Sequence, residues 1–229
     1  MAKHLDLEEQ EQLADIKHFW NEYGNLITWV MIAVFGAIAA WNGWQYWERT
    51  QATQAAAMYD EVERAAQAGD TTRVERAFSD MKDKFGRTTY AQQAGLLAAK
   101  TLEEKGNIDG AKAALAWVAD KASDEGYQAV ARLRLASLLV QAKAYDEALK
   151  QLSEPFPKEF DALAADRRGD VYLLQGKKPQ AQAEYTRAYK GLDDNTEYRR
   201  LVEVKLTALG VDTKQLAAAA PATAGAAKP

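Results

Sequence analysis

The chain contains one stretch, from Tyr23 to Trp47, that has no charged side chain at all. This stretch is mostly apolar, and as a helix its 25 residues would extend ~37 Å, at ~1.5 Å per residue. A bilayer core is ~30 Å thick, so such a helix crosses it with some tilt. We therefore expect a single membrane-spanning helix over residues 25–47, followed by a much longer water-facing domain.

Aromatic residues stand at both ends of this stretch: Trp20, Tyr23, Trp44, Tyr46 and Trp47. Trp and Tyr concentrate at membrane interfaces, where an apolar ring with a polar atom suits the headgroup region. The pattern favours a membrane span over the first alternative, which is the buried core helix of a soluble protein. A core helix of this length rarely lacks every charge.

The second alternative is a cleaved signal peptide, because Ala37, Ile38 and Ala39 match a small-x-small cleavage site. Two observations disfavour it. The preceding residues 1–24 are acidic, whereas a signal peptide begins with basic residues, and the apolar pattern continues past the site to Trp47. We therefore expect an uncleaved anchor.

Residues 1–24 are interpreted as an acidic amphipathic leader. Its apolar side chains fall on one helical face: Leu13, Ile16, Trp20 and Tyr23. Orientation is governed by the Lys and Arg residues near each end of a span. Here Lys17 flanks one end and Arg49 the other, so charge alone does not assign a side of the membrane to the large domain.

Small residues recur within the expected span at spacings of three and four, namely Gly36, Ala40 and Gly43. Small side chains on one helical face let a second transmembrane helix approach closely. We expect these three residues to pack against a helix of a membrane partner.

Composition removes several classes of chemistry from residues 51–229, which contain neither Cys nor His. Thiol nucleophiles, histidine bases and zinc sites therefore lack their usual residues. The same segment carries 26 basic and 26 acidic residues, and a neutral domain without a basic run is a poor partner for nucleic acid. We expect no catalytic residue, no metal and no cofactor.

Residues 48–210 are Ala-rich, with helical periodicity and no strand-like alternation, so we expect an all-α fold. A small residue recurs early in every second helix: Ala77, Ala111, Ala148 and Ala181. These residues are 34, 37 and 33 positions apart, close to the ~34-residue period of tetratricopeptide repeats. The alternative is an irregular Ala-rich helical bundle.

Residues at two further positions recur at a fixed distance from these four alanines. A larger residue follows each of these alanines by four positions: Met81, Leu115, Leu152 and Tyr185. A small residue precedes each by twelve: Ala65, Ala99, Ala136 and Gly169. Antiparallel helices that cross closely need small residues at the crossing and larger ones beside it. The sequence therefore predicts a tetratricopeptide-repeat-like α-solenoid, with a last helix over 195–209 as its cap.

The first helix of each repeat lines the concave face of such a solenoid. Counting from the small residues, we expect six exposed positions on this face to contact partners: Gln93, Lys100, Glu103, Ser137, Asp166 and Asp170. These side chains are polar and of mixed sign, which suits a protein or extended peptide. Asp166 and Asp170 are also one helical turn apart, so a carboxylate pair of a hydrolase is an alternative.

Residues 211–229 are Ala-, Pro- and Thr-rich, and we expect them to be disordered.

The stretch Glu8 to Trp20, EEQEQLADIKHFW, resembles the start of the YfgM family of bacterial inner-membrane proteins. The resemblance covers an acidic leader, an Ile-Lys-x-aromatic-Trp element, one transmembrane helix and tetratricopeptide repeats, to about Leu209. It implies a cytoplasmic N-terminus and a periplasmic repeat domain. It also implies an ancillary role at the SecYEG translocon beside a PpiD-type membrane-anchored chaperone, with secretory proteins as clients. The competing hypothesis is a scaffold for another cell-envelope assembly.

Overall fold

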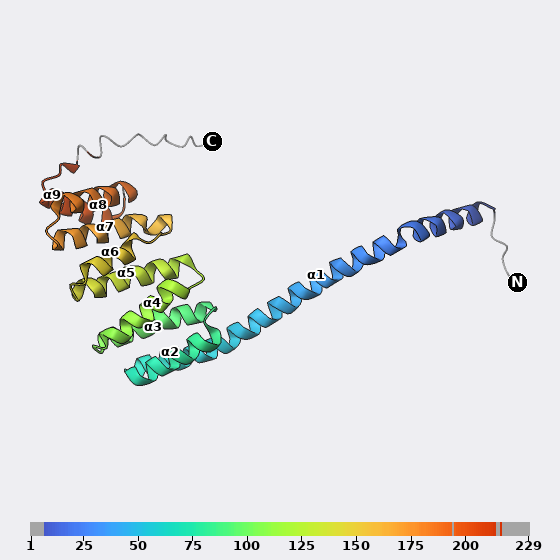
Figure 1. Ribbon diagram of the computed structural model, residues 1–229, viewed down its shortest axis with the longest axis horizontal. Helices are drawn as coiled ribbons and strands as arrows, with labels where there is room; N and C mark the ends of the chain where they lie inside the picture. The colour runs from blue at the N-terminus through green and yellow to red at the C-terminus, as the bar shows by residue number, and fades with distance from the viewer. Residues whose placement is uncertain (1–6, 194, 214–215, 217–229) are drawn as a thin grey trace. The chain divides into compact units, whose positions relative to one another are not determined.

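The structure is a computed structural model, and it describes residues 7–193, 195–213 and 216 (Figure 1). Within these residues the regular secondary structure consists of helices. They are α1 (Leu7–Ala68), α2 (Thr71–Phe85), α3 (Thr89–Glu104), α4 (Ile108–Lys121), α5 (Glu125–Gln141), α6 (Tyr145–Ser153), α7 (Lys158–Leu174), α8 (Lys178–Gly191) and α9 (Glu197–Ala208). The all-α prediction is confirmed.

The chain divides into two compact units, residues 1–53 and 54–229, with α1 continuing through the division. In the first unit the charge-free stretch exposes its large side chains, with Trp29 65 % and Phe35 60 % accessible. Within the part of the chain that the structure describes, one helix is long and apolar enough to cross a membrane. Its apolar stretch is not a buried core helix, because only 6 % of it is buried.

The second unit is built of helix pairs. Residues 54–68 of α1 pair with α2, as the Arg73–Glu61 ion pair illustrates, and Tyr59 of α1 also contacts the Tyr90 ring of α3. The pairs α3/α4, α5/α6 and α7/α8 follow, and α9 packs on α8. All four alanines of the repeat register are buried, as are the four larger residues that follow them. This is the tetratricopeptide-repeat-like arrangement that the spacing predicts.

The turn between the two helices of a pair is formed in the same way in four pairs. Gly69, Gly106, Lys143 and Gly176 each adopt a left-handed backbone conformation, with φ of 68°, 80°, 60° and 74°. The amide that follows each of them donates to a carbonyl in the last turn of the preceding helix, which satisfies groups that the helix end leaves unpaired. The turns thus reverse the chain without leaving buried polar backbone.

Helices α7 and α8 pack closely at Gly169. A Cβ atom on Gly169 would lie 2.5 Å from the Tyr185 ring, so only glycine fits against this tyrosine. The neighbouring repeats have smaller partners sixteen positions after their small residue, Leu115 after Ala99 and Leu152 after Ala136. The smallest crossing residue, Gly169, therefore stands in the same repeat as the largest partner residue, Tyr185.

This complementarity predicts that Gly169→Ala destabilises the fold. Crowding of Tyr185 should cost ~1–3 kcal/mol, and the helix preference of alanine returns only ~0.5–1 kcal/mol. The urea midpoint of the full chain, followed by circular dichroism, should fall. In the double variant Gly169→Ala/Tyr185→Leu, which copies the Ala/Leu pairs of the other repeats, the cost of the alanine should disappear. An equal cost of Gly169→Ala in both backgrounds would contradict the pairing.

Beyond α9 the chain stays packed for a few residues. Val211 is half-buried against the last helices, and the buried Thr213 hydroxyl donates to Glu203 at 2.9 Å. The remainder of the segment for which disorder is predicted, residues 214–215 and 217–229, lies outside the described residues, as do residues 1–6 of the leader.

Candidate functional site

The first helices of successive pairs adjoin one another, α3 beside α5 and α5 beside α7, and they carry the six side chains for which partner contact is predicted. Lys100 and Glu103 of α3 are exposed. Lys100 forms a long ion pair with Glu104, with 3.8 Å between Nζ and the carboxylate oxygen. Gln93 is half-buried and donates to the Tyr127 hydroxyl at 2.8 Å.

Ser137 and Asp170 come together although they lie on different helices, because both line one cleft between α5 and α7. Ser137 of α5 is exposed, and its hydroxyl donates to the Leu133 carbonyl at 3.1 Å within its own helix. Asp170 of α7 is partly buried. Of the six positions, these two therefore form a local site.

Asp166 differs from the expectation of an exposed concave position, because its side chain is 0 % accessible. Lys205 of α9 donates to both of its oxygens, at 2.8 and 2.9 Å, and the Tyr198 hydroxyl donates to one of them. The cap helix therefore covers this carboxylate. As the structure stands, a partner on the concave face cannot reach it.

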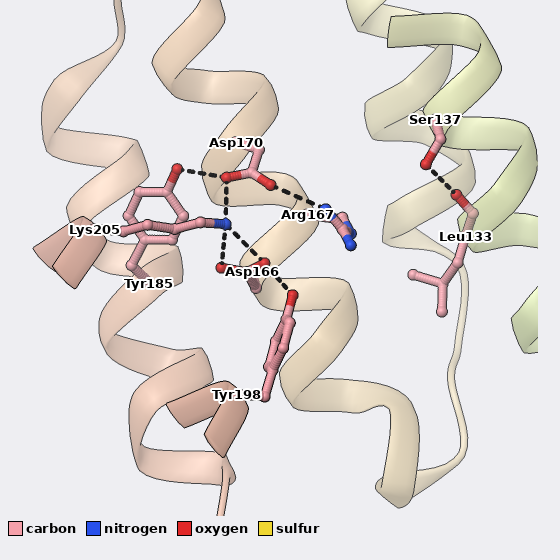
Figure 2. A network of polar contacts seen from close by, with 8 residues as sticks. All are labelled: Leu133, Ser137, Asp166, Arg167, Asp170, Tyr185, Tyr198 and Lys205. Atoms are coloured by element: carbon pink, nitrogen blue, oxygen red, sulfur yellow. Dashed lines mark hydrogen bonds and ion pairs between the residues drawn. The ribbon is translucent and has the colours of Figure 1, made fainter. Parts of the chain in front are cut away.

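A single ammonium group joins the two carboxylates of α7, as Figure 2 shows. Lys205 Nζ lies 2.6 Å from Asp170 Oδ1 and also contacts Asp166. The Tyr185 hydroxyl of α8 donates to the same Asp170 oxygen at 2.8 Å. Side chains of α7, α8 and α9 thus meet in one network.

The two phenols of this network remain protonated donors. Burial is the main cause that raises the pKa of Tyr185 and of Tyr198 well above the usual value, and the hydrogen bonds to Asp170 and Asp166 add to it. Because both carboxylates already accept hydrogen bonds from Lys205 and from a phenol, the arrangement ties three helices together. It offers no free pair of carboxylates of the kind a hydrolase requires.

The cleft between α5 and α7 has a volume of about 120 Å³. Its walls are mostly apolar: Leu133, Ala136, Val140, Leu152 and Val171, with Ser137, Arg167 and Asp170 as its polar members. The polar surface of mixed sign that is predicted for the concave face therefore does not extend to this part of it.

The apolar lining residues were missed because the sequence reasoning selected polar side chains. A signal was present in the repeat register. Leu133 stands three positions before Ala136, where the next repeat has Asp166 before Gly169. Val140 likewise corresponds to Glu103 of the preceding repeat. Reading every residue at the concave register, apolar ones included, would have found them.

In the first unit, the three small residues of the apolar stretch are exposed, and a Cβ placed on Gly36 or on Gly43 would meet nothing within 4 Å. The face that contains Ala40 is therefore open. Its use by a partner helix stays a prediction.

Comparison with known proteins adds two findings. A family model described as a tetratricopeptide repeat-like domain matches residues 17–211. Among curated proteins, the "Ancillary SecYEG translocon subunit" of Neisseria gonorrhoeae is 31 % identical over 210 residues, which cover 91 % of this chain and 100 % of that protein. The proteins of the same name from Escherichia coli and Aggregatibacter actinomycetemcomitans are each 28 % identical, over 89 % of this chain and 97 % and 98 % of theirs. The similarity extends from the apolar helix through the last repeat.

Proposed function

The chain belongs to the YfgM family of ancillary SecYEG translocon subunits, whose domain is tetratricopeptide repeat-like, and on this premise we propose that it is a membrane-anchored interaction module of the translocon. It assists the transfer of secreted and envelope proteins. Its partners are SecYEG, a PpiD-type membrane-anchored chaperone and the secretory chains themselves. It acts by binding rather than by catalysis.

The observation that carries this proposal is the extent of the similarity. The matched region includes the apolar helix as well as every repeat, so the relatives share the anchor together with the binding domain. The exposed apolar stretch supports insertion in the bacterial inner membrane. Adjoining first helices with exposed polar residues support a protein partner on the concave face.

The topology we propose has the N-terminus in the cytoplasm and residues 48–210 in the periplasm. Charge does not decide this orientation, because Lys17 and Arg49 balance. Protease added to spheroplasts should therefore digest the repeat domain while the inner membrane is intact. Digestion only after that membrane is opened would contradict the topology and, with it, periplasmic clients.

Site-specific photocrosslinking tests the partners. A photoreactive residue at Lys100 or at Ser137, both exposed on first helices, should capture translocon subunits, the chaperone or secretory chains in intact membranes. The same probe at Lys190, exposed on the second helix α8, is the matched control and should capture less. Capture of subunits of another envelope assembly without any Sec component would support the scaffold hypothesis instead.

A further inference from the structure

A cleft on the concave face is lined by side chains whose chemistry is more specific than the proposed function requires. It lies between α5 and α7 and is open to solvent, with a volume of about 120 Å³. A cavity of ~150 Å³ accepts a benzene molecule. The cleft between α5 and α7 is therefore the right size for one aliphatic side chain, and its Leu133, Val140 and Val171 walls are apolar.

Of the two charged residues that line the cleft, Asp170 has close partners and Arg167 has only a distant one. Asp170 is already engaged within the fold, because its Oδ1 accepts from Lys205, which it shares with Asp166, at 2.6 Å and from Tyr185 at 2.8 Å. Arg167 reaches its other oxygen only at 3.4 Å, and the Arg167 side chain is 44 % exposed. This guanidinium is therefore accessible to a further carboxylate from solvent.

A second guanidinium stands on the facing helix. Arg134 lies three residues before Ser137, so the two share a face of α5. Arg134 is exposed, and among the described residues it has no hydrogen-bond or ion-pair partner. The apolar cleft thus has one loosely paired arginine in its lining and one unpaired arginine a helical turn from its Ser137, while the acid in its lining, Asp170, is already engaged.

We propose that this cleft binds an extended segment of a partner chain through one aliphatic side chain, with an adjacent Asp or Glu of that segment held by Arg134 and Arg167. The aliphatic group supplies apolar burial, and the carboxylate supplies direction and selectivity, because two guanidinium groups attract it and repel a basic residue. This inference rests on the proposed use of the concave face for partner binding. To that proposed function it adds the kind of segment that binds, namely one with an aliphatic residue next to an acidic residue.

The experiment measures fluorescence polarisation of labelled Gly/Ser peptides against the full chain in phosphatidylcholine nanodiscs. A peptide with central Leu-Glu should bind about tenfold more tightly than one with Ser-Glu, because burial of an aliphatic side chain is lost. It should bind about fivefold more tightly than one with Leu-Lys, because two partly exposed ion pairs become repulsions.

Two variants, each with a matched control, locate the binding. Ser137→Trp introduces a ring at the cleft from an exposed position and should abolish the preference for Leu, whereas Ser79→Trp on the exposed surface of α2 should not. Arg134→Gln/Arg167→Gln should abolish the preference for Glu over Lys, whereas Lys190→Gln should not. Both altered residues of the arginine pair are exposed, so the fold should be unaffected.

Equal binding of the three peptides, or a preference that survives Ser137→Trp, would overturn the inference. Such a result leaves the proposed function intact if photocrosslinks from Lys100 still reach the translocon. The reverse outcome, peptide selectivity without any captured Sec component, would sustain the cleft and contradict the assignment to the translocon.

Discussion

Replacing Lys205 with Met should destabilise the last repeat by about 3–5 kcal/mol, because removing one member of a buried ion pair leaves the other charge uncompensated. Asp166 is 0 % accessible and Lys205 only 22 %. A methionine is of similar bulk but has no ammonium group, so it also loses the cation–π contact of Lys205 Nζ, which lies 5.1 Å from the Tyr185 ring centroid, and the loss is mainly electrostatic. The cost should appear as a lower urea midpoint.

The damage should also be local. In a solenoid each repeat contacts only its neighbours, so amides of α9 and of the end of α7 should exchange hydrogen faster while those of α3 and α4 are unchanged. Lys190→Met, at an exposed position of α8, is the control and should shift neither quantity.

A second substitution separates the charge from the side chain that carries it. Asp166→Asn in the Lys205→Met background removes the stranded carboxylate and should restore part of the lost stability. If Lys205→Met alone is no less stable than the wild type, the ammonium group does not compensate Asp166, and the network in Figure 2 does not hold the cap.

The helix pairs of this fold could be predicted from spacing because their contacts are periodic. Ala111 and Leu115 are buried for the same reason as Ala148 and Leu152, since each repeat presents the same crossing to its neighbour. A pattern that occurs four times identifies small crossing residues even when the motif is degenerate.

The polar network could not be predicted in this way, because it occurs once. Asp166 meets Lys205 across 39 positions, and no repeat period relates the two. Asp166 occupies a concave register that is open in the middle of a solenoid but is covered by the cap helix at its end. Its burial therefore depends on tertiary placement of α9, which local spacing does not encode.

The apolar cleft between α5 and α7 could not be predicted from the sequence for a different reason. Leu133 and Val140 are apolar residues at helical spacing, a pattern that normally marks a buried core. They border an open cleft instead, because a space remains between α5 and α7 that Leu152 of α6 only partly lines. Sequence periodicity gives the face of a residue but not the separation of two helices.

Two arginines in the middle of the apolar stretch should release the chain from the membrane. In Val34→Arg/Ile38→Arg each arginine adds about 2.5–3.5 kcal/mol to the free energy of insertion at the helix centre. Both sites lie close to the middle of residues 25–47, so neither guanidinium can easily extend to the headgroup region. After carbonate extraction the variant should be found in the soluble or degraded fraction, whereas the wild type should sediment with membranes.

Thr50→Arg/Thr53→Arg is the matched control, because it adds the same two charges just beyond residues 25–47. There the long arginine side chains reach the headgroup region, so membrane association should persist. Sedimentation of Val34→Arg/Ile38→Arg with carbonate-washed membranes would show that the apolar stretch is not the anchor. Release of both variants would place the end of the span later than Trp47. Since the small face of Gly36, Ala40 and Gly43 lies within the same stretch, release should also abolish any photocrosslink from it to a membrane partner.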